Sequence, residues 1–232
     1  MNSQIKVLIG NRKLYFQVLL FMVLVSMFSI LVFGWSFGSI PLNAYHPLWL
    51  NVYFINYTFM GNGLFAISLA AVYRFRFKTK KEGMALLYAF LFSAAIVQLL
   101  KNLGNFSHPF FFIEQGQYLF VRDRALDQAG FISGHTTTAF ALATVLMLLS
   151  KRGFWQLPLL AAAVLLGYSR IYLAQHSLAD VIISAVLGTV AGVIAVHFVC
   201  DKAKNFAAFR NVFRVRYKEP MSPNENSLPL AH

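Results

Sequence analysis

Leu178–Cys200 reads LADVIISAVLGTVAGVIAVHFVC, and this stretch decides the class of fold. Its 23 residues contain one acidic side chain, Asp180, near the start and one imidazole, His197, near the end. A helix of about 20 apolar residues is long enough to cross the hydrocarbon core of a bilayer. The stretch therefore predicts a transmembrane helix.

Five further segments have the same apolar character, although the fourth of the six is short and opens with three threonines. We predict an all-α, polytopic membrane protein with six transmembrane helices. They cover approximately Tyr15–Phe37, Val52–Tyr73, Met84–Leu103, Thr136–Leu149, Phe154–Leu173 and Leu178–Cys200. The first segment is too long for a signal peptide and lacks a small-residue cleavage site, so we expect it to be retained.

The composition of the whole chain supports this class. Hydrophobic residues make up 58% and charged residues 12% of the 232 residues, whereas soluble domains carry about a quarter charged residues. The single cysteine, Cys200, excludes a disulfide scaffold. The net charge of +12 lies in short clusters between apolar runs, so we expect contact with membrane lipids and no nucleic-acid partner.

The basic residues predict the orientation of the helices. Of the 20 lysines and arginines, 16 lie in the N-terminus, the second and fourth connections, and the tail. By the positive-inside rule, both termini face the cytoplasm. In a bacterium this would be the inner membrane, with the odd-numbered connections on the periplasmic side.

Three parts follow along the chain: a six-helix membrane domain over 1–200, a basic segment over 201–219 and a disordered tail over 220–232. Phe206, Phe209 and Phe213 recur at helical spacing among lysines and arginines. This pattern is typical of an amphipathic helix on the anionic inner leaflet. An extension of the last helix without a separate role explains it equally well.

Five ionisable residues fall at the predicted outer ends of the helices: Lys101, His135, Arg170, His176 and Asp180. Ionisable groups near membrane depth are costly and mark candidate sites. Because all five fall on one face, we expect them to form one cluster.

The residue types in this cluster suit a phosphate group. Two cations match a dianion, and the helix that begins near Ser133 and Gly134 offers free N–H groups to its oxygens. The two histidines supply a nucleophile and a proton donor. Asp180 follows His176 by four residues, hence on the same helical face, where it can hold one ring nitrogen protonated.

The order and spacing of these residues resemble the motifs of the type-2 phosphatidic acid phosphatase superfamily, which are K-x6-R-P, P-S-G-H and S-R-x5-H-x3-D. The third is complete, as Ser169-Arg170, His176 and Asp180. The second lacks only its proline, as Ile132-Ser133-Gly134-His135. In the first, Lys101 is followed after six residues by His108-Pro109, so His108 replaces the arginine.

The resemblance implies a membrane phosphatase that uses no metal and no other cofactor. His176 would form a phosphohistidine, Asp180 would orient it, and His135 would protonate the leaving oxygen and then activate water. The phosphate oxygens would be bound by Lys101, Ser133, Gly134, Arg170 and His108. The expected substrate is a lipid phosphate or diphosphate at the outer face, with undecaprenyl diphosphate, phosphatidylglycerol phosphate, phosphatidic acid and lipid A phosphates as the family's candidates.

Several alternatives stay open. Protonated His108 could replace the motif arginine, Arg122 or Arg124 could fold back to do so, or the site could be weakened, which would leave a lipid-phosphate-binding protein. A phosphotransferase would use the same residues as a hydrolase. A proton-coupled transporter would need polar residues at the centres of the helices. Those centres are apolar, so this function is disfavoured. Neither the oligomeric state nor the choice of lipid follows from the sequence.

Overall fold

The computed structural model describes residues 3–34, 45–103, 132–150 and 152–216, with side chains from Val7 to Asp201. These residues are helical, with no strand among them. The helices are α1 (Ser3–Gly10), α2 (Lys13–Phe33), α4 (Leu48–Tyr57), α5 (Gly63–Ala71), α6 (Lys80–Leu103), α7 (Gly134–Leu149), α8 (Gln156–Tyr172) and α9 (Leu178–Arg216). Short helical turns, η1 (Thr58–Gly61), η2 (Val72–Arg76) and η5 (Gly153–Trp155), join some of them.

Each of the six predicted segments is mainly helical where it is described, and the all-α class is confirmed. Within the described residues, four stretches are long and apolar enough to cross a membrane: Lys13–Phe33, Lys80–Leu103, Gly153–Tyr172 and Leu178–Asp201. The predicted second span is broken, since Leu48–Gly61 and Gly63–Arg76 meet at an angle of 60°. The predicted fourth span, α7, has only 16 residues. Six spans and cytoplasmic termini therefore stay predictions, while these apolar helices are those of an integral membrane protein.

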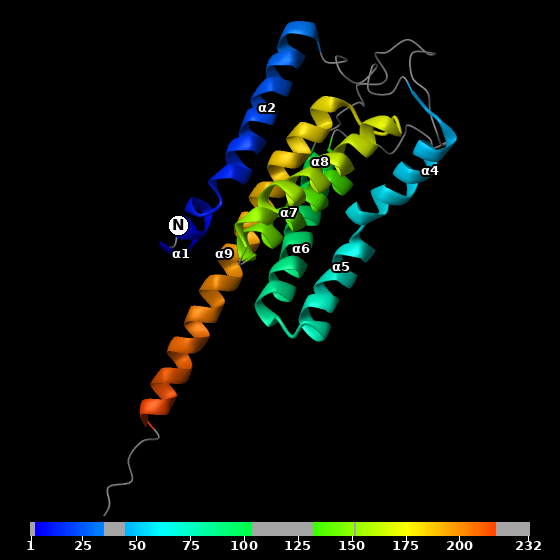
Figure 1. Ribbon diagram of the computed structural model, residues 1–232. Coiled ribbons are helices and arrows are strands. Elements are labelled where there is room, and N and C mark those ends of the chain that lie inside the picture. Colours follow the sequence, from blue (N-terminus) through cyan, green and yellow to red (C-terminus); the bar gives the residue numbers. More distant parts are fainter. Residues whose placement is uncertain (1–2, 35–44, 104–131, 151, 217–232) are drawn as a thin grey trace, which may run out of the picture.

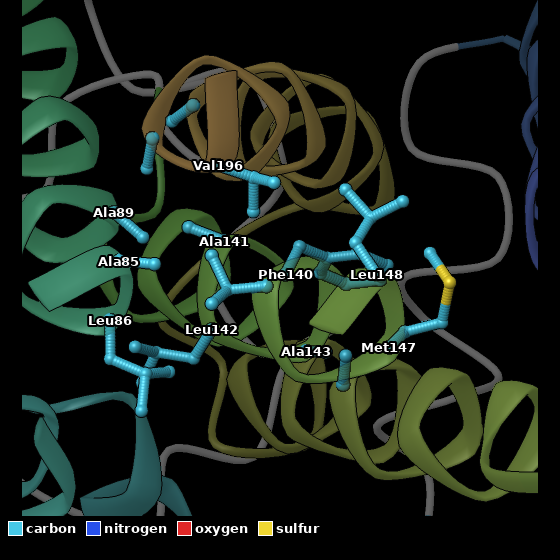
Figure 2. Packing of buried hydrophobic residues seen from close by; sticks show 14 of the residues in the cluster. Ala85, Leu86, Ala89, Phe140, Ala141, Leu142, Ala143, Met147, Leu148 and Val196 are labelled. Carbon is cyan, nitrogen blue, oxygen red and sulfur yellow. The ribbon is translucent and has the colours of Figure 1, made fainter. Parts of the chain in front are cut away.

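The short α7 is the centre of the bundle. Twelve of its residues are buried, among them Phe140, Ala141 and Leu142. Figure 2 shows Ala85, Leu86 and Ala89 of α6 lying along one side of α7, with Val196 of α9 on another. A helix enclosed in this way does not need the length of a lipid-exposed span.

Close contact between α7 and α9 depends on two glycines. A Cβ atom at Gly188 would lie 2.2 Å from the Thr137 carbonyl oxygen, and one at Gly192 would lie 2.7 Å from that of Ala141. The pair is spaced as Gly-x-x-x-Gly, which allows two helix backbones to approach closely within a membrane. This packing fixes the middle of the α9 span against the first half of α7.

The outermost helix, α2, stands beside the others (Figure 1). Only 11% of the residues in its most apolar stretch are buried. The face of α2 that points inward carries Tyr15, Leu19, Val23, Ser26 and Ile30 at helical spacing. The Tyr15 hydroxyl lies 3.1 Å from the Thr144 hydroxyl of α7, which holds the first turn of α2 to the core.

The basic connections lie at the end of the bundle opposite the starts of α7 and α9. Arg12 donates from Nε to the Met147 carbonyl oxygen at 3.2 Å and from Nη2 to that of Ser150. A cation beside the last carbonyl groups of a helix is favourable for the helix dipole. Arg74 contacts Gly83 near the start of α6 at this same end.

The last helix continues without a break to Arg216, well beyond the predicted end of the span at Cys200 (Figure 1). Both interpretations of this segment predict a helix, so both stay open. The boundaries at 201 and 220, and the membrane-surface role of 201–219, stay predictions.

Candidate active site

The ends of four helices meet at one end of the bundle, here called the site end. Helix α6 ends just beyond Lys101, α7 begins at Gly134, α8 ends just beyond Arg170, and α9 begins just after His176. These four helix ends carry Lys101, His135, Arg170 and His176. The structure therefore brings together four of the five ionisable residues that the sequence predicted to cluster, and Asp180 joins them through His176.

His176 and Asp180 form the most sharply defined pair. Nδ1 of His176 lies 3.6 Å from Oδ2 of Asp180, and their side chains are 8% and 0% exposed. The same carboxylate oxygen accepts the Ser177 N–H at 2.9 Å, while the Asp180 N–H donates to the Ser177 hydroxyl at 3.2 Å. This reciprocal cap of α9 fixes the carboxylate. Because Nδ1 faces Asp180, Nε2 is the ring nitrogen turned away from this carboxylate.

The start of α7 is fixed by hydroxyl groups. Ser133 is the N-cap, and its Oγ accepts the Thr136 N–H at 3.3 Å and the Thr136 hydroxyl at 2.9 Å. The Ser133 N–H donates to the Ser184 hydroxyl at 2.8 Å, and Ser184 in turn donates to the Asp180 carbonyl oxygen at 2.6 Å. One serine of α9 therefore joins the cap of α7 to the first turn of α9.

Gly134 leaves room for a ligand at the start of α7. A Cβ atom there would meet nothing closer than Val97 Cγ1, at 3.8 Å, so packing among the described residues does not demand glycine. The first N–H groups of a helix lack acceptors within the helix. Those of Gly134 and His135 find no acceptor within the described part of the chain, which makes them suitable donors for phosphate oxygens.

Arg170 is held from an unexpected direction. Its side chain is buried, with 8% exposed, and Nη1 donates to the Thr58 hydroxyl of η1 at 2.7 Å. Among the described residues, Nε has no acceptor. A buried guanidinium N–H needs an acceptor, and a phosphate oxygen would supply one.

The same break in the second apolar segment contacts His135. A Cβ atom at Gly61 would lie 2.7 Å from the His135 carbonyl oxygen and 2.8 Å from its Cβ. The site residues predicted from the sequence did not include Thr58, Gly61 and Ser184. The available signals were the paired Gly61 and Gly63 inside an apolar segment, and the position of Ser184 one turn beyond Asp180.

The remaining predicted residues lie as follows. Lys101 is exposed in the last turn of α6, which suits an ionic contact or a position at the membrane interface. His108, Arg122 and Arg124 lie outside the described residues, so the three interpretations of the first motif stay open. His197, half-buried in α9, pairs with Asp201 at 3.1 Å, remote from the site end.

A second polar contact lies on the α4 side of the site end. His46 Nδ1 lies 3.1 Å from Oδ1 of Asn51, and the His46 ring contacts the Tyr172 ring in a tilted arrangement, with the ring centroids 4.4 Å apart. Within the described residues, no three His, Cys, Asp or Glu side chains gather as metal ligands would.

Comparison with known proteins identifies the family. The PAP2 superfamily model matches residues 82–204, which contain all the site residues discussed from α6 to α9. The chain is 30% identical over 132 residues to a lipid A 4'-phosphatase of Porphyromonas gingivalis, over 53% of this chain and 52% of that protein. It thus spans about half the length of this curated relative.

A solved structure supports the same assignment. The chain resembles the crystal structure of Aquifex aeolicus LpxE with a TM-score of 0.58 and 29% identity, over 68% of this chain and 92% of that one. The family match, the helix arrangement and the motif residues agree, and the chain belongs to the PAP2 superfamily, which is the type-2 phosphatidic acid phosphatase superfamily.

Proposed function

We propose that the protein is a membrane lipid phosphatase that removes phosphate from a lipid phosphate or diphosphate at the outer face, by way of a phosphohistidine. The observation that carries this proposal is the buried His176–Asp180 pair, which lies at the same end of the bundle as Arg170 and the start of α7. Family membership supports the reaction class. A lipid A 4'-phosphatase among the relatives makes lipid A phosphates the first substrates to examine.

The proposed reaction has two steps. Nε2 of His176 attacks phosphorus in line with the leaving oxygen, and the P–O bond to the lipid breaks while His135 donates a proton to that oxygen. Asp180 stabilises the positive charge that develops on the His176 ring. In the second step, His135 takes a proton from water, which attacks phosphorus and releases inorganic phosphate and free His176.

The phosphoryl oxygens are stabilised by hydrogen-bond donors at the site end. Arg170, the N–H groups at the start of α7 and Lys101 supply positive charge where negative charge gathers in the transition state. The Ser133 hydroxyl proton is the remaining donor, since its oxygen already accepts two bonds. No step in this scheme requires a metal ion.

The proposed location is a multi-pass protein of a bacterial inner membrane with the site facing the periplasm. Support comes from the positive-inside pattern and from the contacts of Arg12 and Arg74 at the end opposite the site. The head group of a lipid in the outer leaflet would then meet the site end.

The proposal is tested by phosphate release from purified protein in detergent with EDTA, between pH 5 and 8. The panel contains lipid A phosphates, undecaprenyl diphosphate, phosphatidylglycerol phosphate and phosphatidic acid, and His176→Ala runs beside the wild type. We expect release that the variant abolishes, and a ³²P label on wild-type protein that is stable to base and labile to acid. Folded wild-type protein that releases no phosphate from any of these lipids would contradict the proposal.

A further inference from the structure

An apolar cavity of about 190 Å³ lies between α2, α8 and α9, with Phe140 of α7 at its base. Its walls include Leu19, Val23 and Ser26 of α2, Val164 of α8 and Ala185 of α9. The lining is almost wholly hydrocarbon, so it suits neither a phosphate nor a sugar.

The cavity extends from the depth of the site toward the middle of the bundle. On α9 it runs from Leu178, two residues before Asp180, to Ala185, which is about 10 Å along the helix axis. On α8 it runs from Ile171, the neighbour of Arg170, to Val164. One end therefore lies at the depth of the His176–Asp180 pair.

Helix α2 packs on the bundle at both ends of the cavity. Tyr15 is held at one end through Thr144, and Ile30 packs with Ala179 and Ile182 at the other. Between these contacts, α8 and α9 are pressed together, since a Cβ atom at Gly167 would lie 2.8 Å from Val181 Cγ1. The space is thus bounded by α2 and the closed α8–α9 seam.

We propose that this cavity binds an acyl chain of the lipid phosphate substrate. This inference rests on the proposed function, because the occupant is argued from the apolar lining and from the position of Ile171 and Leu178, which lie next to Arg170 and close to His176 in the sequence. A lipid whose phosphate lies beside Arg170 and His176 has its first methylenes at the depth of Ile171 and Leu178. The rest of the chain then follows the apolar wall between α2 and α9, and the cavity selects substrates by chain length.

Filling the cavity should separate long-chain from short-chain substrates. Ser26→Phe and Val164→Phe place rings in it, while Val25→Phe adds the same ring at a neighbouring position that is 47% exposed and does not line it. Two lipid phosphates with one head group are compared, one with a hexanoyl and one with a myristoyl chain. Burial of each methylene is worth about fourfold in affinity, so we expect both filling variants to lose at least about tenfold in kcat/KM on the long chain.

The short chain supplies the internal control. Its kcat/KM should stay within about twofold of wild type in all three variants, which shows that the catalytic groups are intact. Filling variants that match Val25→Phe on the myristoyl substrate would overturn the inference. Wild-type protein that hydrolyses neither substrate would instead count against the proposed function.

A crosslinking measurement decides the matter for wild-type protein, including the case in which the variants do not fold. A lipid phosphate with a diazirine on its acyl chain should label peptides that contain residues 19–26 or 178–185. The unlabelled lipid phosphate should compete this labelling at least about tenfold better than phosphatidylcholine does. Equal competition would identify a bulk membrane lipid as the occupant, and label confined to other segments would exclude the cavity; either result overturns the inference.

Discussion

Nη1 of Arg170 donates to the Thr58 hydroxyl at 2.7 Å across 112 residues of sequence. Thr58 opens η1, the turn at which the second apolar segment bends by 60°. Gly61 of the same turn contacts the His135 backbone. The bend therefore supports two site residues at once, a cation and an imidazole.

Thr58→Val should test whether this contact positions Arg170. Valine keeps the shape of threonine and removes the acceptor, which leaves a buried guanidinium N–H unpaired at a cost of about 1–3 kcal/mol. We expect kcat/KM to fall roughly 10- to 100-fold in a protein that still folds, while Thr58→Ser retains most activity. Steady-state kinetics with a thermal melt check this, and an unchanged kcat/KM in Thr58→Val would exclude a positioning role.

Asp180→Asn should separate the charge of the carboxylate from its place in the helix cap. The amide oxygen can still accept the Ser177 N–H, so α9 should start as before. The amide cannot stabilise a cationic His176 ring, and we expect kcat to fall about 10²- to 10⁴-fold with little change in KM. Circular dichroism provides the folding control. Activity within threefold of wild type would refute the proposed role of Asp180.

Gly134→Ala and Gly61→Ala form a matched pair with different expected effects on stability. Among the described residues, a methyl group at Gly134 meets only Val97, at 3.8 Å, so the protein should keep its stability and lose phosphate binding, with KM raised about tenfold. A methyl group at Gly61 would lie 2.7 Å from the His135 carbonyl oxygen, so it should lower the melting temperature as well as activity. Thermal melts and kinetics on both proteins decide this, and wild-type kinetics in Gly134→Ala would remove that glycine from the site.

Much of the fold could be predicted from the sequence, because apolar run length is a strong signal for helices in a membrane. This signal failed for the second segment, because hydropathy does not reveal a bend at Asn62. It also could not show that α7 is short because other helices enclose it. Burial by neighbouring helices depends on contacts between distant segments, which no local pattern records.

The site residues also include some that could be predicted from the sequence and some that could not. The contact between His176 and Asp180 was expected from their spacing, but the shared helical face was wrong, because His176 lies before the first residue of α9. Thr58 and Ser184 reach the site through contacts across 112 and 51 residues. Their side chains are ordinary polar groups of helical segments, and only the packing of the helices gives them partners.

Ser184→Ala should reveal how firmly α7 and α9 are joined. The variant removes the acceptor of the buried Ser133 N–H, which costs about 1–3 kcal/mol of unfolding free energy. We expect a lower melting temperature in detergent and a smaller loss of activity than in Asp180→Asn. Ser29→Ala is the control, because its hydroxyl bonds only within α2 at an exposed position. Equal melting temperatures for the two variants would show that the Ser184 contact adds nothing to stability.

His108→Arg tests which cation completes the first motif. An imidazole titrates near pH 6.5, so a site that needs protonated His108 should be most active below that pH and lose activity as pH rises through it. Arginine stays charged throughout this range, and its planar fork suits phosphate oxygens. We therefore expect His108→Arg to keep its activity at pH 6 and to raise kcat/KM at pH 8 roughly tenfold over wild type.

If Arg122 or Arg124 fills the position instead, the pH profile should not change in His108→Arg, while Arg122→Ala or Arg124→Ala should raise KM about tenfold. Complete loss of activity in His108→Arg would contradict a cationic role for this histidine.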